Sequence, residues 1–397
     1  MIIKFLHLSD IQYLTIKDIC DLQAGYGFES HKYKENGEPI LRVTSLKNNK
    51  IDDTQLKFFY PSDYSKNLEK HILRPNEIVI SKDGTIGKVA FNNKNCNFYL
   101  SSQLIKVIPK TNIHTRYLFH FLISKTKEIE KMTTGKSAIL HLNLTKFKNL
   151  KIPIPTLEKQ KEIANKLDKF SKLSEELQEE LSLRKKQYEY YRDELLSFKQ
   201  DNKIEWLTLG EIETDIYRGS PITKSQLANS GKPCLKYGEI YTTHKIWFNK
   251  CISYLGETNL KSYRYCEYGD LLFAIDGETP EEIGTCVTYL GKEKLIIDTH
   301  IVVIKHKQNP KYLAYALSTF DAQKQKIKLS NINQIVGINK EKLKKIKIPI
   351  PSLEKQQEIS NLLDKFWKLS NNIKEGLPAE ILLRKHQYEY YRDKLLK

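Results

Sequence analysis

The feature that most constrains this chain is a long repeat inside it. Lys-Ile-Pro-Ile-Pro-Thr-Leu-Glu-Lys-Gln begins at Lys151 and returns, with Ser for Thr, from Lys347. Gln-Tyr-Glu-Tyr-Tyr-Arg-Asp occurs unchanged from Gln187 and from Gln387. A long-period repeat decides an architecture more firmly than any local propensity does. The chain, at 397 residues, is also too long for one ordinary core, so we expect two related lobes.

A long helix is predicted after each copy of the first motif. From Leu157 to about Phe198 such a helix would be roughly 60 Å long, more than a compact domain needs, which indicates a spacer. The second copy is longer by four residues, an insertion that falls at the segment Gly376-Leu377-Pro378, and we expect the second helix to break there. The apolar residues of the first copy recur at helical or heptad steps: Ile163, Leu167, Phe170, Leu173, Leu177, Leu181, Tyr188, Tyr191 and Leu195.

Each helical motif follows a segment with the pattern of a mixed α/β lobe. Strands are predicted within 77–84 and 270–277, both ending in a glycine turn, and at 105–108 and 301–304. Short helical patterns follow at 117–123 and 312–317. The fold class is therefore α+β, with lobes at 1–150 and 204–346 and helical regions at 151–203 and 347–397.

The charge balance favours a polyanionic partner. Lys and Arg outnumber Asp and Glu by 65 to 48, which gives a formal charge of +17. The excess is spread along the chain, so a lysine-rich solvated surface is the alternative interpretation. No stretch of about 18 apolar residues occurs, and the six cysteines form no Cys-x-x-Cys pair. We expect a cytoplasmic protein with free thiols and no bound metal.

The two repeated motifs, in the order lobe, helix, lobe, helix, closely resemble type I restriction-modification specificity subunits over essentially the whole chain. The resemblance implies two target recognition domains, each reading half of a split site in double-stranded DNA. It also implies two long antiparallel helices, a coiled coil with pseudo-two-fold symmetry, that dock two methyltransferase subunits and through them restriction subunits. S-adenosylmethionine is expected in the methyltransferase, and no cofactor in this chain.

Loop segments in both lobes suit contact with DNA. Corresponding glycine turns can present side chains to base edges or phosphates, although a plain β-turn would have the same sequence. The segment 26–33 and its counterpart from Tyr217 mix aromatic residues with hydrogen-bond donors. The candidate DNA-binding residues are Tyr26, Ser30, Lys32, Lys82, Asp83, Thr85, Arg218, Lys224, Asp276 and Thr279.

The near-identity of the two helical motifs indicates binding to two copies of one partner, although coiled-coil cohesion alone would explain the tyrosines. We expect the tyrosines to face the helix pair and the basic side chains to point outward. The candidate partner-binding residues are Arg184, Lys185, Tyr188, Tyr191, Arg192, Arg384, Lys385, Tyr388, Tyr391 and Arg392.

The sequence carries no pattern for catalysis. Asn309-Pro-Lys-Tyr is similar to the Asn-Pro-Pro-Tyr motif of adenine methyltransferases, but Lys311 replaces the second proline and a helical pattern follows, so we interpret Asn309 as a helix N-cap. No P-loop pattern occurs. The rival interpretations are a nuclease or methyltransferase fused to recognition lobes, and a coiled-coil scaffold that binds protein rather than DNA.

Overall fold

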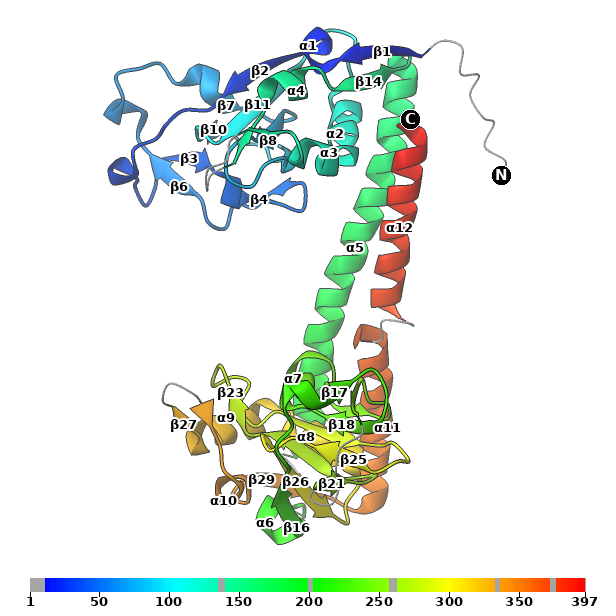
Figure 1. Ribbon diagram of the computed structural model, residues 1–397. Coiled ribbons are helices and arrows are strands. Elements are labelled where there is room, and N and C mark those ends of the chain that lie inside the picture. The colour runs from blue at the N-terminus through cyan, green and yellow to red at the C-terminus, as the bar shows by residue number, and fades with distance from the viewer. Residues whose placement is uncertain are drawn as a thin grey trace. The chain divides into compact units, whose positions relative to one another are not determined.

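The computed structural model (Figure 1) describes residues 11–134, 140–198, 203–256, 263–332, 336–371 and 376–396. The chain divides into two compact units: unit 1 is Met1–Leu177 with Ile381–Lys397, and unit 2 is Gln178–Glu380. Each unit therefore joins one lobe to helical segments from both copies of the repeat. The predicted boundaries between lobes and helical regions stay a prediction, because the units are divided along other lines.

The lobe of unit 1 is built on two four-stranded sheets. The first has the order β2-β11-β8-β9 and is antiparallel throughout, and the second has the order β6-β3-β10-β7 with β3 and β10 parallel. Helix α2 (Thr115–Ser124) shares one apolar core with the first sheet. The strands are β2 (Cys20–Ala24), β3 (Glu38–Leu41), β6 (Lys57–Phe59), β7 (Ile72–Leu73), β8 (Ile78–Ser81), β9 (Val89–Phe91), β10 (Phe98–Leu100) and β11 (Leu104–Pro109).

The lobe of unit 2 repeats this plan with two five-stranded sheets, in the orders β16-β26-β22-β24-β19 and β17-β20-β18-β25-β21. Helix α8 (Pro310–Leu317) takes the place of α2. The strands are β16 (Glu213–Arg218), β17 (Leu227–Ala228), β18 (Lys232–Leu235), β19 (Trp247–Phe248), β20 (Ser253–Leu255), β21 (Tyr265–Cys266), β22 (Leu271–Ala274), β24 (Cys286–Tyr289), β25 (Leu295–Ile297) and β26 (Ile301–His306). The predicted mixed α/β lobes are confirmed.

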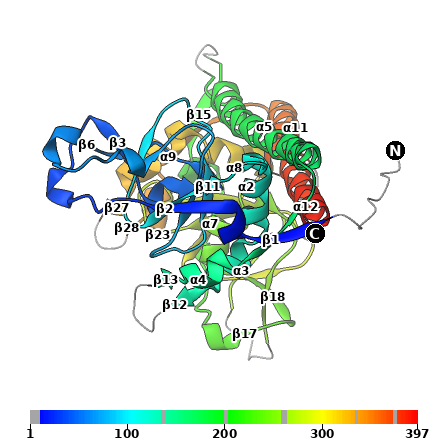
Figure 2. The same ribbon diagram turned by 90° about the horizontal axis from the view of Figure 1, so that it is seen from above.

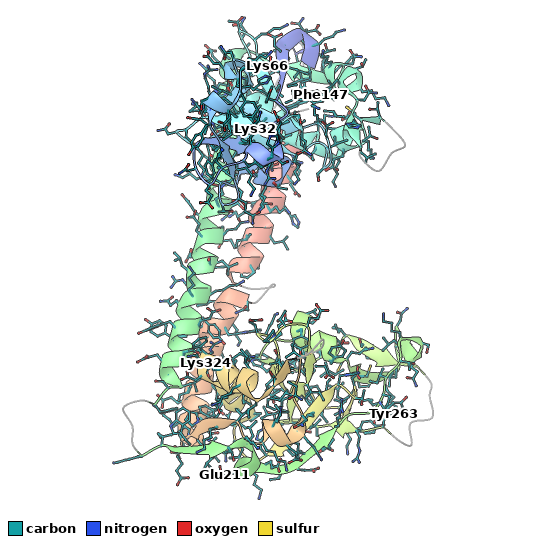
Figure 3. All side chains as sticks on the ribbon, turned by 90° about the vertical axis from the view of Figure 1, so that its left-hand side faces the viewer. Lys32, Lys66, Phe147, Glu211, Tyr263 and Lys324 are labelled. Atoms are coloured by element: carbon teal, nitrogen blue, oxygen red, sulfur yellow. The ribbon has the colours of Figure 1, made fainter. Side chains whose placement is uncertain are left out.

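Shorter elements complete the lobes. In unit 1 they are β4 (Leu46–Lys47), β5 (Lys50–Ile51), the hairpin of β12 (Thr133–Thr134) and β13 (His141–Leu142), and helices α1 (Ile16–Ile19), α3 (Thr126–Glu130) and α4 (Leu144–Lys148). In unit 2 they are β23 (Asp276–Gly277), β27 (Asn331–Ile332), β28 (Val336–Gly337), and helices α6 (Leu209–Ile212), α7 (Tyr237–Thr242), α9 (Phe320–Leu329) and α10 (Lys340–Leu343). Helices α1 and α6 both begin with a capping box, Thr15 with Asp18 and Thr208 with Glu211; Glu211 is labelled in Figure 3.

The long helices follow the sequence prediction. Helix α5 (Leu157–Leu195) is continuous, whereas the second copy forms α11 (Leu353–Asn371) and α12 (Leu377–Leu395), so the predicted break is confirmed. In unit 1, α12 lies alongside the first half of α5 and runs in the opposite direction (Figures 1 and 2). The Phe170 and Tyr391 rings stack there at 5.2 Å, and in unit 2 Tyr191 and Phe366 stack at 5.6 Å.

The repeated proline motif fastens each lobe to the start of its helix. Its Lys-Ile-Pro-Ile residues form β14 (Lys151–Ile154) and β29 (Lys347–Ile350), which pair with β1 (Gln12–Thr15) and β15 (Glu205–Thr208). Its glutamine is buried in both copies. The amide of Gln160 accepts from the backbone N–H of His114 (2.9 Å) and donates to the backbone oxygens of Asn112 (3.2 Å) and Pro155 (2.9 Å). Gln356 makes the matching bonds with Asn309 (2.9 Å) and Pro351 (2.8 Å).

We predict that Gln160→Leu lowers the free energy of unfolding by about 1–3 kcal/mol, because buried backbone groups lose their hydrogen-bond partners. Chemical denaturation of the purified chain measures the effect. Gln178→Leu, at an exposed glutamine of the same helix, is the control and should change little. Equal stability of the two variants would contradict this role for the motif.

Candidate nucleic-acid interface and partner-binding helices

In lobe 1, the lobe of unit 1, the predicted turn residues lie where β8 ends. The Asp83 carboxylate pairs with the Lys82 ammonium and accepts a hydrogen bond from Nδ1 of His141 (2.7 Å). Burial raises the pKa of the Asp83 carboxyl, but its bonds with Lys82 and His141 outweigh burial and hold the pKa below its usual value. Thr85 is exposed on the same turn. A charged, hydrogen-bonding group therefore lies at the end of the sheet where β8 finishes, and we call this end the loop edge.

The segment 26–33 divides into a packed part and an exposed part. The Tyr26 ring is half-buried among aromatic neighbours, 5.2 Å from Phe28 and 5.7 Å from Tyr64, so it stabilises the lobe. Ser30 is exposed on a 3-10 turn (Ser30–Lys32). Lys32, labelled in Figure 3, pairs with Glu29 (2.8 Å) and lies over the Tyr64 ring at 4.7 Å. Contact of these residues with DNA stays a prediction.

In lobe 2, the lobe of unit 2, three of the four candidates lie at the loop edge, where β16 and β22 end. Arg218 ends β16, and its Nε donates to the backbone oxygen of Thr299 (2.6 Å). Asp276 follows β22 and accepts from Nδ1 of His300 (2.5 Å). Thr279 is exposed a few residues further along. Lys224 is exposed on a separate 3-10 turn (Lys224–Gln226).

A polar junction attaches lobe 1 to the helices of unit 1. Nε of Arg116, on α2, donates to both carboxylate oxygens of Asp168, on α5, at 3.1 Å. Nε2 of His120 lies 2.7 Å from the same carboxylate, and Nδ1 of His120 lies 3.0 Å from the hydroxyl of Tyr388, on α12. Because a carboxylate can only accept, His120 donates through Nε2 and accepts from Tyr388 through Nδ1.

The ionisation of these groups agrees with that direction of hydrogen bonding. Burial opposes the charge of Asp168, but His120 and Arg116 outweigh burial and hold the pKa of the carboxyl at about 2. Burial lowers the pKa of His120 and raises the pKa of Tyr388, so the ring is neutral and the phenol keeps its proton.

The same junction recurs in unit 2 with different partners. Asp364, on α11, corresponds to Asp168 in the repeat and pairs with Lys311 of α8. It also accepts from Nε1 of Trp247 (3.0 Å) and from the hydroxyl of Tyr315 (2.7 Å). Tyr188, the counterpart of Tyr388, is buried in the core of unit 2. Sequence reasoning did not single out Asp168 or Asp364, although Leu-Asp-Lys-Phe occurs in both copies of the repeat, from Leu167 and from Leu363.

The helical candidates divide between packed and exposed positions. Tyr191 and Tyr391 stack on the facing helix, as predicted, whereas Tyr188 and Tyr388 pack toward the lobes. Arg184, Lys185 and Lys385 are exposed, and Arg384 is half-buried. The expectation that every basic side chain points outward was wrong for Arg192 and Arg392. Their side chains are only 14% and 16% exposed, because each lies over the tyrosine one turn earlier and pairs with the next aspartate.

One exposed tyrosine in each copy was missed by the sequence analysis. Tyr190 and Tyr390 are 63% and 59% exposed, and each ring lies 5.4 Å from the following tyrosine in an edge-on arrangement. Tyr190 borders a pocket of about 410 Å³ that is also lined by Trp206 and Phe320. Tyr190 and Tyr390 are therefore equivalent aromatic groups available to a partner.

Two further observations bear on chemistry. The Asn309 side chain accepts from the backbone N–H of Tyr312 (3.0 Å) with Pro310 at the first helical position, so the N-cap interpretation is confirmed. Within the described ranges, no three His, Cys, Asp or Glu side chains are grouped as metal ligands, and none of the helices has the length and hydropathy to cross a bilayer. Two lobes that present polar loops, each bonded to a carboxylate at the same place in the helical repeat, indicate a duplicated binding protein.

Comparison with known proteins identifies the family. Residues 9–183 and 202–383 each match the type I restriction modification DNA specificity domain. The chain belongs to this family and carries its DNA-recognition domain twice, as a type I specificity subunit does.

Relatives and solved structures agree with this assignment. The chain is 33% identical over 264 residues to the type I restriction enzyme EcoR124I/EcoR124II specificity subunit of Escherichia coli, a match that covers 64% of each chain. It is 31% identical over 308 residues to a putative type I restriction enzyme specificity subunit of Haemophilus influenzae, covering 75% of this chain and 76% of that one. The crystal structure of a type I S subunit from M. genitalium has the same fold, with a TM-score of 0.56 at 16% identity over 100% of this chain and 98% of that chain.

We predict that Asp168→Asn lowers the free energy of unfolding at neutral pH by about 1.5 kcal/mol, the low end for hydrogen bonds to a charged group that is partly exposed. The folded pKa of about 2 lies below the ordinary value of 3.8. This stabilisation is therefore present above about pH 4 and is lost as the pH falls toward about 2.

Denaturation of wild type and variant at several pH values tests this pattern. The two curves should converge as the solution is acidified below pH 4. Asp21→Asn, at an exposed aspartate of the same lobe, is the control. A difference that stays constant down to pH 2 would show that the Asp168 charge does not stabilise unit 1.

Proposed function

We propose that this chain is the DNA-reading subunit of a type I restriction-modification complex and that its lobes read the two halves of a split, asymmetric site. The observation that carries the proposal is the contrast within the repeat. The helical motifs and their junction carboxylates occur in both copies, whereas the sheets differ in strand number and the edge loops differ in sequence. Two lobes that share a scaffold but differ in their loop surfaces are suited to reading two different half-sites.

The charge supports DNA as the ligand. A formal charge of +17 gives the chain an electrostatic attraction to phosphates that is independent of sequence. Each loop edge carries a basic residue, the partly exposed Lys82 in lobe 1 and the exposed Arg218 in lobe 2. The loops at these edges differ in sequence between the two lobes. Phosphate contacts of this kind position a reader, and neighbouring side chains then select the bases.

The helices dock two copies of a methyltransferase subunit in this proposal, one at each copy of the motif. That subunit supplies S-adenosylmethionine and adenine methylation, and restriction subunits join through it, while this chain contributes no catalysis. Support comes from the equivalent exposure of Tyr190 and Tyr390 and of Lys185 and Lys385. Exposed tyrosines support docking most directly, because aromatic residues are enriched at protein interfaces.

The central test is to co-express the chain with its methyltransferase in a host that lacks DNA methylation and to map modified bases by single-molecule sequencing. We expect a bipartite, non-palindromic motif. A palindromic motif, or a stable complex that methylates nothing, would contradict the proposal. Binding of the methyltransferase without binding of DNA at moderate salt would favour the protein-scaffold interpretation.

We predict that Tyr190→Ala and Tyr390→Ala each weaken binding of one methyltransferase copy by about tenfold or more, as truncation of an interface tyrosine commonly does. The double variant should lose both copies, measured as the mass of the complex in solution. Lys169→Ala on α5 and Lys365→Ala on α11, at exposed positions that are equivalent in the repeat, are the controls. Full assembly of the double variant would contradict docking at these tyrosines.

A further inference from the structure

In each lobe, one histidine contacts the aspartate that follows the central strand β8 or β22. His141 is 54% exposed and lies 2.7 Å from Asp83, and His300 is 44% exposed and lies 2.5 Å from Asp276. In both pairs the contact is made by Nδ1 of the ring. Because the carboxylate can only accept, Nδ1 carries a proton and Nε2 is the ring nitrogen left for another partner.

The two histidines occupy different backbone positions, which the hydrogen bonds around β8 and β22 define. In lobe 1, Leu142 donates to the backbone oxygen of Lys82 (2.7 Å) and Lys82 donates to that of Gln103 (2.8 Å). The matching bonds in lobe 2 run from Ile338 to Ile275 (2.9 Å) and from Ile275 to His300 (3.1 Å). His141 therefore corresponds to Gly337, and His300 corresponds to Gln103.

Each lobe therefore has its histidine at one of these two positions and a different residue at the other. Asp83 pairs with His141 across an antiparallel bridge, and Asp276 faces Gly337 in the same register. A Cβ at Gly337 would lie 3.6 Å from Asp276 Oδ1, so any side chain there would meet the carboxylate. Lobe 2 instead supplies the histidine from the turn before β26. Duplication of an ancestral lobe does not explain a pair that is rebuilt from another position.

Stability does not explain the pairs well either, because exposed ion pairs contribute little to folding. Their surroundings suit a polyanion. Lys82 pairs with the same carboxylate as His141, and Arg218 bonds the residue before His300. The Tyr237 ring lies 5.1 Å from the His300 ring, and Tyr241 donates to the backbone oxygen of Asp276 (2.7 Å), so α7 holds the second pair in place.

We propose that His141 and His300, each oriented by its aspartate, are equivalent DNA contacts that hydrogen-bond through Nε2 to acceptor atoms of the half-site read by their own lobe. This inference rests on the proposed function and names its recognition groups. To donate through Nε2 while Nδ1 donates to the carboxylate, the ring in the DNA complex must carry a proton on both nitrogens. The acceptor is a phosphate oxygen or the O6 and N7 edge of guanine, which both accept from such an N–H. The aspartates are positioning residues, since they fix the ring without contacting DNA.

The test uses the complete complex with the methyltransferase and the variants His141→Gln and His300→Gln. Each variant should affect one half-site and leave the other as an internal control. A guanine contact predicts a loss of discrimination of about tenfold or more at one base pair. A phosphate contact predicts weaker binding to every sequence and a salt dependence reduced by about one charge. Either result supports the proposal, and His386→Gln, at an exposed histidine on α12, should have neither effect.

A rescue variant makes the test sharper. Adding Gly337→His to His300→Gln moves the histidine of lobe 2 to the position used in lobe 1, and the backbone there has no positive φ to oppose it. We expect part of the lost recognition to return, and no recovery would overturn the equivalence of the two positions. A split motif with both single variants unchanged would overturn this inference alone. A wild-type complex without a split motif would overturn the proposed function as well.

Discussion

A carboxylate held between a lobe helix and a spacer helix is the interaction on which each unit depends. Asp168 and Asp364 stand at the same place in the two copies, and each receives hydrogen bonds from two or more side chains of its lobe. An apolar seam alone can slide, whereas directed bonds to a charged group fix the angle at which two elements meet. These bonds therefore determine how each lobe meets the helices of its own unit.

The junctions also show how the two lobes diverged without losing their attachment. The carboxylate stays, while its partners change from Arg116 and His120 to Lys311, Trp247 and Tyr315. The guanidinium of Arg116 lies over Phe91 at 4.4 Å, and the ammonium of Lys311 lies over Trp247 at 4.3 Å, so a cation resting on an aromatic ring recurs with new residues. Interactions are retained here even where residue identities are not.

Sequence reasoning reached the architecture because its signals were local or repeated. The period of the helices, the break at Gly376 and the N-cap at Asn309 all depend on residues close together in the chain. The orientation of Arg192 was wrong because the helical pattern does not say that its stem would cover Tyr188. The pairing of His141 with Asp83 was beyond reach because it depends on a hairpin that returns to the sheet edge 58 residues later.

The makeup of the two units has a consequence for synthesis of the chain on the ribosome. Unit 2 lies within Gln178–Glu380, but unit 1 takes its final helix from Ile381–Lys397. Until those residues are synthesised, His120 cannot accept its hydrogen bond from Tyr388, and Phe170 cannot stack on the ring of Tyr391. At typical elongation rates lobe 1 waits on the order of ten seconds or more with this apolar surface uncovered. Translation speed and chaperone access therefore matter more for the first lobe than for the second, although the first is made earlier.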